Sequence, residues 1–240
     1  MRIFRNFVEA YHEVEREIKH NGLLYQTQTV QDKNVDDTDE FITKELIGYS
    51  FLVKKPNVDE FIQYLNLNTD WIKQEFIERT DGKRANPGEA YKLREVWNEF
   101  LHNGYFSYTY GGRIAQQVND VIKLFKKVPF SRHGLINIYD KCVDNEWDRR
   151  LGKKRVPCSM YYMLFNREVN SIRSDTQKQL ETHMIYNIRS NDFSSHFPYD
   201  LVLARLLQEY IAHELGTESG DFIYQSGSLH CFKKDNKEIF

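Results

Sequence analysis

The chain is short of cysteine and proline, and it has no long uninterrupted run of apolar residues. Its three cysteines, Cys142, Cys158 and Cys231, cannot all pair, which argues against a disulfide-rich secreted scaffold and favours reduced thiols. No apolar stretch approaches the roughly 18 residues of a membrane helix, and the acid-containing N-terminal segment does not resemble a signal peptide. We therefore expect an intracellular, cytoplasmic protein with no membrane partner.

An excess of charge of one sign is also missing. The formal net charge is −2 at pH 7, so the composition lacks the broad basic surface of proteins that bind nucleic acids or anionic membranes. A nucleoside monophosphate needs only a local cluster of cations, which this balance permits. Because repeats, low-complexity tracts and Pro/Gly-rich linkers are absent as well, we expect a single domain over residues 1–240.

What the sequence does contain is a mixture of helical and strand-like segments. Apolar side chains recur at helical spacing over residues 3–18, and Asn21 with Gly22 is typical of a helix end. Further helices are expected at 58–78, 88–102, 113–126 and 201–215, and strands at 46–53, 135–139, 156–165, 182–189 and 221–232. Because the two types mix without strict alternation, the sequence predicts an α+β fold.

Short motifs in the C-terminal half carry the chemically distinctive residues. Residues 156–159 read Val-Pro-Cys-Ser, residues 189–192 read Arg-Ser-Asn-Asp, and residues 227–230 read Gly-Ser-Leu-His. Residues 198–200 read Pro-Tyr-Asp, and this aspartate lies eleven residues after the arginine of the second motif. In order and spacing these motifs resemble the thymidylate synthase superfamily, which has a Pro-Cys nucleophile, Arg-Ser-x-Asp, Pro-Phe-Asn at the same offset, and Gly-Asp-x-His.

Three upstream segments extend the resemblance, which then spans roughly residues 45 to 232. Residues 131–133 (Ser-Arg-His) resemble the Ser-Arg-Arg of the family, and residues 108–111 (Tyr-Thr-Tyr-Gly) resemble its Tyr-Gly segment. Residues 71–75 (Trp-Ile-Lys-Gln-Glu) look like the segment with the catalytic glutamate. The resemblance implies a thymidylate synthase-like fold, in which helices flank a mixed β-sheet. It also implies a homodimer that packs sheet to sheet and completes its active sites across the two-fold axis.

By this resemblance Cys158 is the nucleophile. Carbon 5 of a pyrimidine is a poor nucleophile until a group adds to carbon 6, and a thiolate can add there and later leave. Such a thiolate needs a stabilising environment, for which a nearby arginine is suited. Without the motif, a small buried side chain is the commoner role of a free cysteine, and Cys142 and Cys231 keep that interpretation.

Four residues are candidates for binding the nucleotide phosphate. Guanidinium groups and hydroxyls are good partners of a phosphate dianion, although a lone arginine is more often a solvated surface charge. The resemblance assigns Arg189 and Ser190 to the phosphate of their own subunit, and Arg132 and His133 to that of the neighbouring subunit. His133 replaces an arginine of the family and is a weaker, pH-sensitive cation. The family's arginine in an N-terminal loop has no clear counterpart.

Asp200 stands where the family's synthases have an asparagine that meets the base. An amide matches the donor and acceptor edge of uracil, whereas cytosine offers an amino donor and, after attack at carbon 6, a readily protonated N3. A carboxylate supplies two acceptors to these two donors. The alternative is an aspartate that caps the helix expected at 201–215. The phage deoxycytidylate hydroxymethylases also have an aspartate at this position, together with Arg-Ser-Asn-Asp and Gly-Ser-Leu-His. In these three features the chain resembles them.

The remaining roles follow from the resemblance one by one. Glu75 is the acid/base that relays protons, and an exposed helical glutamate is the alternative. Asp192 contacts the folate co-substrate, Tyr110 lies near the nucleophile and the phosphate, and His230 holds a sugar hydroxyl. Phe232 replaces a tyrosine of the family, which leaves deoxyribose or ribose open.

The implied reaction joins dCMP and 5,10-methylene-tetrahydrofolate and involves no metal. Addition of Cys158 to carbon 6 activates carbon 5, which takes up the one-carbon unit. Water then completes a hydroxymethyl group in a hydroxymethylase, whereas hydride from the folate completes a methyl group in a synthase. The sequence favours the hydroxymethylase, in the host cytoplasm if a phage encodes it. The alternatives are a thymidylate synthase, a dUMP or CMP hydroxymethylase, and a non-catalytic nucleotide-binding protein on the same fold.

Overall fold

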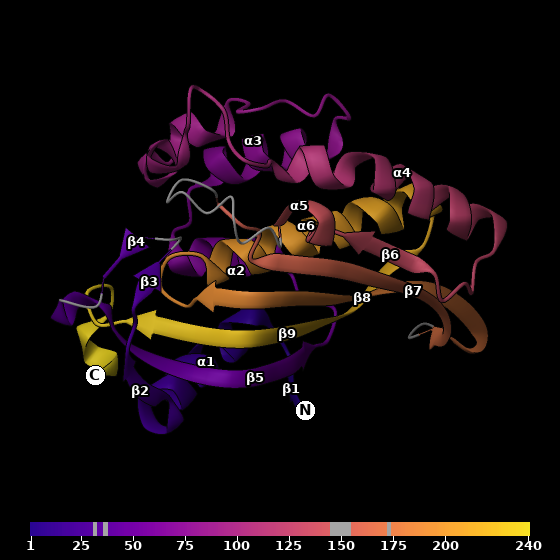
Figure 1. Cartoon of the computed structure of the whole chain (residues 1–240). Helices are drawn as coiled ribbons and strands as arrows, with labels where there is room; N and C mark the ends of the chain where they lie inside the picture. The colour runs from indigo at the N-terminus through magenta and orange to yellow at the C-terminus, as the bar shows by residue number, and fades with distance from the viewer. Residues whose placement is uncertain (31–32, 36–37, 145–154, 172–173) are drawn as a thin grey trace.

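The computed structural model describes residues 1–30, 33–35, 38–144, 155–171 and 174–240. A seven-stranded mixed sheet forms its centre (Figure 1). The strands of this sheet are β1 (Arg2–Phe4), β2 (Leu23–Gln26), β5 (Ile42–Val53), β6 (Gly134–Asn137), β7 (Ser159–Ser171), β8 (Ser174–Asp192) and β9 (Glu218–Phe232), and a separate two-stranded sheet holds β3 (Thr29–Val30) and β4 (Lys33–Asn34). The main sheet runs in the order β1–β5–β9–β8–β7–β6, and β2 also pairs with β5. The β1–β5 and β8–β9 pairs are parallel and the others are antiparallel.

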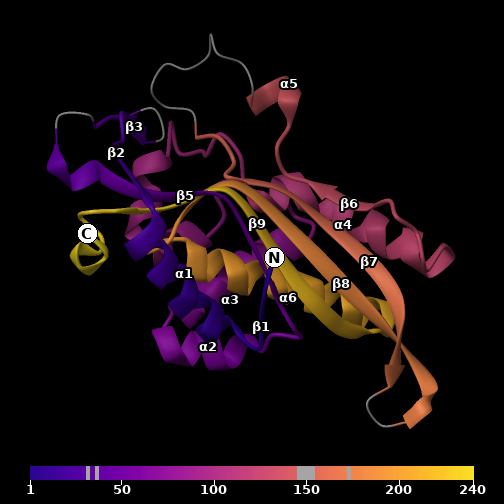
Figure 2. The same cartoon turned by 90° about the horizontal axis from the view of Figure 1, so that it is seen from below.

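Helices flank this sheet. They are α1 (Phe7–Asn21), α2 (Val58–Leu65), α3 (Thr69–Thr80), α4 (Tyr110–Lys127), α5 (Lys141–Asp144) and α6 (Phe197–Leu215), with 3-10 helices η1 (Asp39–Phe41), η2 (Ala90–Leu93), η3 (Glu95–Phe100) and η5 (Lys237–Ile239). α1 packs on β5, α6 on β8 and β9, and α4 on β6, while α3 packs on α4 and α6 (Figures 1 and 2). The predicted α+β architecture, with a mixed sheet flanked by helices, is confirmed.

The two faces of the sheet differ in burial. On β8 and β9, alternate side chains such as Met184, Tyr186 and Phe222 are fully buried in the core with α6. Their neighbours Ile185 and Ile223 point to the opposite face, because successive side chains of a strand alternate, and they are only partly buried. One face therefore forms the core, and the other keeps apolar side chains that are open to further packing.

The helix expected at 58–78 is two helices. Asn66 ends α2 in the left-handed conformation (φ 48°), which an asparagine tolerates better than most residues. Asn68 then begins α3, because its side chain accepts the backbone N–H of Trp71 at 2.9 Å. Two asparagines in close succession thus divide one apolar pattern into two helix directions, and the second of these carries Glu75.

The prediction of a helix at 88–102 is wrong. The segment contains the 3-10 helices η2 and η3, separated by Arg94, whose backbone is extended (φ −145°). At the start of η2, the Glu78 carboxylate accepts the backbone N–H groups of Glu89 and Ala90, at 2.7 and 2.8 Å, which have no acceptor within a first helical turn. The extended Arg94 interrupts the expected helix, and residues on both sides of it line the cavity described below.

Two expected boundaries shift close to the motifs. α6 begins at Phe197 rather than at residue 201, and Pro198 lies in its first turn, where the missing N–H leaves no helical bond unmade. β7 begins at Ser159, so residues 156–158 precede the strand that was expected to include them. Consequently Asp200 lies inside a helix and Cys158 at a strand end. The short strands β1 to β4 were not foreseen.

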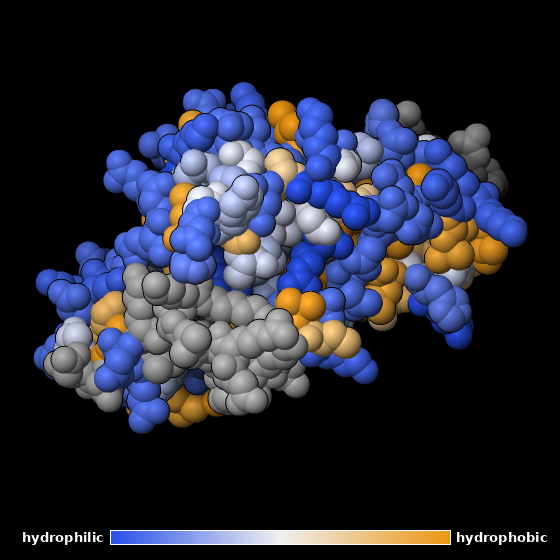
Figure 3. Space-filling model, turned by 45° about the horizontal axis from the view of Figure 1, so that its top comes forward, coloured by the Kyte–Doolittle hydropathy of each residue, from blue (hydrophilic) through white to orange (hydrophobic). Residues whose placement is uncertain are grey.

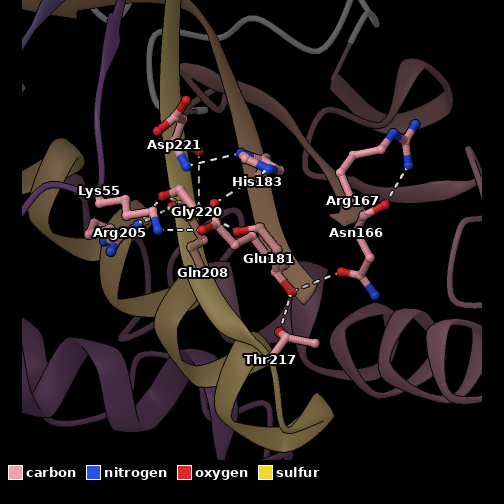
Figure 4. Close-up of polar contacts among 11 residues, drawn as sticks. Lys55, Asn166, Arg167, Glu181, His183, Arg205, Gln208, Thr217, Gly220 and Asp221 are labelled. Atoms are coloured by element: carbon pink, nitrogen blue, oxygen red, sulfur yellow. Dashed lines mark hydrogen bonds and ion pairs between the residues drawn. The ribbon is translucent and has the colours of Figure 1, made fainter. Parts of the chain in front are cut away.

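A buried polar network fixes α6 against the sheet (Figure 4). Gln208 donates to the Thr182 carbonyl of β8 at 2.8 Å, and Arg205 donates to the Gly220 carbonyl of β9 at the same distance. Arg205 also donates to the Gln208 side chain at 2.9 Å, so the two helix residues support each other. Buried polar groups are costly unless paired, and this pairing sets the axial position of α6 and hence that of Asp200.

The surface over α3 and α4 is largely hydrophilic (Figure 3). In α4, apolar residues at helical spacing such as Ile114, Val118 and Phe125 face inward, and polar residues occupy the outer positions. In the part of the chain that the structure describes, no helix is both long and apolar enough to cross a membrane.

Candidate active site

A cavity of about 610 Å³ lies between α3, α4, the start of α6 and the ends of β8 and β9. Eight of the ten predicted site residues line it: Glu75, Tyr110, Cys158, Arg189, Ser190, Asp192, Asp200 and His230. The other two, Arg132 and His133, do not line it and are exposed on the segment before β6. The chain therefore gathers most of the predicted site in one cavity but leaves Arg132 and His133 outside it.

Cys158 is held beside Arg189 at the start of β7. The Arg189 backbone N–H donates to the Cys158 carbonyl at 2.8 Å, which ties the two segments together. The guanidinium donates from Nε to the Pro157 carbonyl at 2.9 Å, and its Nη2 lies 3.9 Å from Cys158 Sγ. A positive charge thus lies beside the sulfur, as a thiolate nucleophile requires.

Asp200 lies in the first turn of α6 and faces the cavity. The N-cap position of the helix is His196, so the alternative interpretation of Asp200 as the cap is wrong. Burial raises the pKa of the Asp200 carboxyl above its usual value, against the opposing effect of nearby cations. These cations come from three further segments and the helix start: His196, Arg79, Arg94 and Arg155.

Glu75 and Arg79 form an ion pair on one face of α3. Arg79 Nε lies 2.8 Å from Glu75 Oε1, and the arginine is almost fully buried at 4% exposure. The Arg79 guanidinium also stacks on the Tyr110 ring, 3.9 Å from its centroid. The glutamate that lines the cavity is therefore fixed in position by a residue that the motifs did not identify.

Tyr110 is the first residue of α4 and belongs to a chain of hydroxyls. Its Oη lies 3.1 Å from Ser159 Oγ, which lies 2.7 Å from Tyr186 Oη. Burial raises the pKa of Tyr110, so the phenol stays protonated at neutral pH and can donate a hydrogen bond. The chain connects α4 to β7 and β8 next to Cys158.

Asp192 ends β8 and shapes the turn that leads into α6. Its Oδ1 accepts the backbone N–H groups of Ser194 and Ser195, at 3.0 and 3.4 Å. Burial favours the protonated form of Asp192, but His196, His230 and Ser195 outweigh this effect and lower the pKa of the carboxyl. Asp192 is therefore an ionised structural anchor that also lines the cavity.

His230 lies on β9 opposite Asp192 of β8 and lines the same cavity. Its Nδ1 is 3.2 Å from Ser228 Oγ on the same strand. Burial lowers the pKa of His230, with Asp192 and Glu45 acting in the opposite direction, so the ring is neutral at pH 7. A neutral imidazole offers one donor and one acceptor.

The motifs missed an aromatic and cationic wall of the cavity. The Arg94 guanidinium lies 4.4 Å from the Tyr199 ring centroid and 4.9 Å from that of Trp71, and the Arg155 guanidinium lies 4.0 Å from that of Trp97. Trp71 and Tyr199 lie within the sequence motifs. Arg94, Trp97 and Arg155 belong to segments without a motif, and Arg94 separates two 3-10 helices. Only the fold brings them together.

Several buried polar atoms along this wall have no hydrogen-bond partner. Among the described residues, they are Trp71 Nε1, Arg94 Nη1, Tyr108 Oη and Asn191 Oδ1, and all four residues line the cavity. Buried polar atoms are normally paired, so these atoms are available to a polar ligand or to water. No group of three or more His, Cys, Asp or Glu side chains within the described ranges could hold a metal ion.

Comparisons with known proteins identify the family of the chain. The chain matches the family model described as thymidylate synthase over residues 11–239. It is 28% identical to a putative thymidylate synthase of Methanosarcina mazei over 61% of this chain and 62% of that protein. It is 29% identical to a putative thymidylate synthase of Methanothermobacter marburgensis over 61% of each chain. The alignment thus spans less than two thirds of the length of these curated relatives.

Two solved structures have the same fold. Thymidylate synthase from T4 phage superposes with a TM-score of 0.69 at 17% identity, over 95% of this chain and 78% of that one. Thermostable thymidylate synthase A from Bacillus subtilis gives a TM-score of 0.69 at 17% identity, over 98% of this chain and 83% of that one. The predicted thymidylate synthase-like fold is confirmed. Because the family model covers all but the ends of the sequence, the chain belongs to the thymidylate synthase family.

Proposed function

We propose that the protein is a deoxycytidylate hydroxymethylase that converts dCMP and 5,10-methylene-tetrahydrofolate to 5-hydroxymethyl-dCMP. The observation that carries the proposal is the shared cavity of Cys158 and Asp200. A sulfur nucleophile and a buried carboxylate in one cavity suit a pyrimidine that is attacked at carbon 6 and presents two donors on its amino edge. An amide at position 200 would suit uracil instead.

The first step is addition of Cys158 sulfur to carbon 6 of the base. Electron density then moves through the ring toward carbon 5 and N3, and Asp200 accepts hydrogen bonds from the 4-amino group and the protonated N3. Before the attack, the Arg189 guanidinium stabilises the thiolate, because its Nη2 lies 3.9 Å from Cys158 Sγ. Departure of the same sulfur at the end restores the aromatic ring.

The phosphate of dCMP is assigned to Arg189 and Ser190 of one subunit, with Arg132 and His133 of the second subunit. Guanidinium and hydroxyl donors suit a dianion. The exposed position of Arg132 and His133, outside the cavity of their own chain, supports this sharing. The half-buried apolar side chains on the second face of the sheet provide the surface for a sheet-to-sheet homodimer.

The cavity also fits the folate co-substrate, which supplies a one-carbon unit at the oxidation level of formaldehyde. Trp71 and Trp97 stack nearly parallel (18°) and give the cavity an aromatic wall for a flat heterocycle. The unpartnered Nε1 of Trp71 adds a hydrogen-bond donor there, and Asp192 an acceptor. Glu75, held by Arg79, is placed to move protons to and from the reacting base through water.

A thymidylate synthase is the second candidate, because the curated relatives carry that description. Asp200 is the feature that separates the two, since a carboxylate lacks the amide donor that O4 of uracil needs. A dUMP or CMP hydroxymethylase and a non-catalytic nucleotide-binding protein are the remaining alternatives.

The test is incubation of the purified protein with the folate and dCMP, dUMP or CMP in separate reactions, followed by mass detection of the nucleotide. We expect a hydroxymethyl product from dCMP alone. A methyl product from dUMP with inert dCMP would identify a thymidylate synthase. A hydroxymethyl product from dUMP or CMP would identify a dUMP or CMP hydroxymethylase. Binding of dCMP without any product would indicate the non-catalytic protein.

A further inference from the structure

A carboxylate from outside the sequence motifs reaches His230 through a serine. Glu45 of β5 lies opposite His230 of β9 in the antiparallel ladder. Ser228 Oγ donates a short hydrogen bond to Glu45 Oε1, and the same Oγ lies 3.2 Å from His230 Nδ1. The three polar groups therefore form a continuous chain that runs from β5 to the cavity, because His230 lines it.

The proton count of this chain fixes the state of the imidazole. A serine hydroxyl has one proton and two acceptor lone pairs, and here the proton is directed at Glu45. Only a lone pair is left for His230, so Nδ1 carries the proton and donates it to Ser228. Because burial lowers the pKa of His230, the ring is neutral and Nε2 is an acceptor.

We propose that Glu45 is a positioning residue that acts through Ser228 to hold His230 as the Nδ1–H tautomer, with Nε2 as an acceptor for a hydroxyl of the ligand. Glu45 does not line the active-site cavity and so acts without touching the ligand. The identity of this hydroxyl as a sugar hydroxyl of a pyrimidine nucleotide rests on the proposed function. The assignment of the His230 tautomer is independent of that function.

The surroundings of His230 are consistent with this assignment. The groups that act on it are Asp192 of β8, Glu45 of β5 and His196 at the start of α6, besides the backbone of Ser228. The Phe232 ring, 4.9 Å from the imidazole, packs on it from the same strand and offers no competing hydrogen bond. A carboxylate or carbonyl that orients a histidine in this way is a recurrent means of fixing which nitrogen faces the substrate.

The tautomer can be measured without any substrate. In protein labelled with ¹⁵N-histidine, the shifts of the two ring nitrogens distinguish Nδ1–H from Nε2–H, and His230→Gln identifies the relevant signals among the eight histidines. We expect Nδ1–H in the wild type. In Glu45→Ala the Ser228 proton is free to bond Nδ1, so the ring should switch to Nε2–H. Glu45→Gln keeps an acceptor oxygen for Ser228 and should retain Nδ1–H.

Either of two results would overturn the proposal: Nε2–H in the wild type, or no change of tautomer in Glu45→Ala. If Glu45→Ala does not fold, Ser228→Ala replaces it, and persistence of a fixed Nδ1–H state in that variant counts against the proposal in the same way. Ser226→Ala is the matched control, because its hydroxyl donates to the Ser228 carbonyl and not to His230.

Substrate affinity provides the second readout. Loss of the acceptor should raise the KM or Kd for the nucleotide about tenfold in Glu45→Ala and leave kcat nearly unchanged, as expected for one ligand hydrogen bond. Glu45→Gln and Ser226→Ala should stay close to wild type. An equal loss in Glu45→Gln and Glu45→Ala would contradict the proposal. Failure of the proposed function would appear instead as absence of product from dCMP, with the tautomer result unaffected.

Discussion

At the scale of single residues, the cavity is lined by side chains of opposite charge, such as Arg189 and Asp200. Arg189 supplies positive charge to Cys158, whereas Asp200 is a carboxyl that burial disfavours as an anion and that several cations support. Such an arrangement costs folding free energy in the free protein, because buried charges and unpartnered donors lose hydration. The cost is recovered when a ligand fills the cavity with complementary groups.

Cys158→Ala should abolish the chemistry and preserve binding. Exchange of the hydrogen on carbon 5 of dCMP requires prior addition at carbon 6, so tritium release from [5-³H]dCMP should fall by at least about a thousandfold. Cys142→Ala is the control, because Cys142 is exposed and does not line the cavity, and it should behave as wild type. Undiminished tritium release in Cys158→Ala would exclude this sulfur as the nucleophile.

Asp200→Asn should move the base preference from cytosine toward uracil. The amide adds a donor where the carboxylate has only acceptors, so we expect the activity with dCMP to drop about a hundredfold or more and an activity with dUMP to appear. Product analysis with both nucleotides is the measurement. An unchanged preference would show that Asp200 does not read the base.

The same variant should change the pH dependence of stability. The pKa of Asp200 is raised in the folded protein, so the ionised carboxylate destabilises the fold at neutral pH, and this penalty fades as the pH falls toward the usual range of an aspartate. Asp200→Asn should therefore melt at a higher temperature than wild type at pH 7, with a gain that shrinks in acid. Asp120→Asn on the exposed face of α4 is the control and should change the melting temperature little. If the gain in melting temperature of Asp200→Asn over wild type grew as the pH fell, the pKa of Asp200 would not be raised in the folded protein.

At the scale of elements, the site depends on the close contact of α3 and α4. Gly111 lies in the first turn of α4, where a Cβ would come within 2.0 Å of the Glu78 carbonyl of α3. This contact places Tyr110 over Arg79 and so connects the phenol to the Glu75 ion pair. The backbone of one helix is thus part of the positioning of side chains from both.

Gly111→Ala should force the two helices apart. We expect a loss of about 1–3 kcal/mol in the free energy of unfolding, as for other overpacked sites. Turnover should also fall, because Glu75 and Tyr110 move relative to Cys158. Gly112→Ala is the matched control, since its Cβ would meet only Thr109 Oγ1, at 3.1 Å. Urea unfolding of both variants tests the prediction, and equal stabilities would argue against it.

At the scale of the whole molecule, the proposed homodimer would complete each site with the exposed Arg132 and His133 of the second subunit. A mixture of Cys158→Ala and Arg132→Ala subunits tests this sharing, because each heterodimer would contain one site with both residues intact. After equal amounts are mixed and allowed to exchange, about a quarter of wild-type activity should return. No recovery, with dimer exchange confirmed independently, would place each site within one subunit.

The local sequence determined a considerable part of this picture. The order of the motifs around Cys158, Arg189 and His230 indicated the family and eight of the residues that line one cavity. The roles of these residues followed from the resemblance to the family, whereas local spacing predicted the helices and strands that carry them. The same spacing failed at 88–102, where the extended backbone of Arg94 divides the segment into two 3-10 helices.

Only the tertiary structure decided which further charges act on the site. Arg79, Arg94 and Arg155 carry no motif, and they meet near Asp200 because α3, the 3-10 segments and the segment before β7 converge there. Glu45 reaches Ser228 across 183 residues of sequence through the pairing of β5 with β9. Periodicity reports which face of an element is buried, whereas contacts between distant segments arise when packing offsets the entropy of closing the chain.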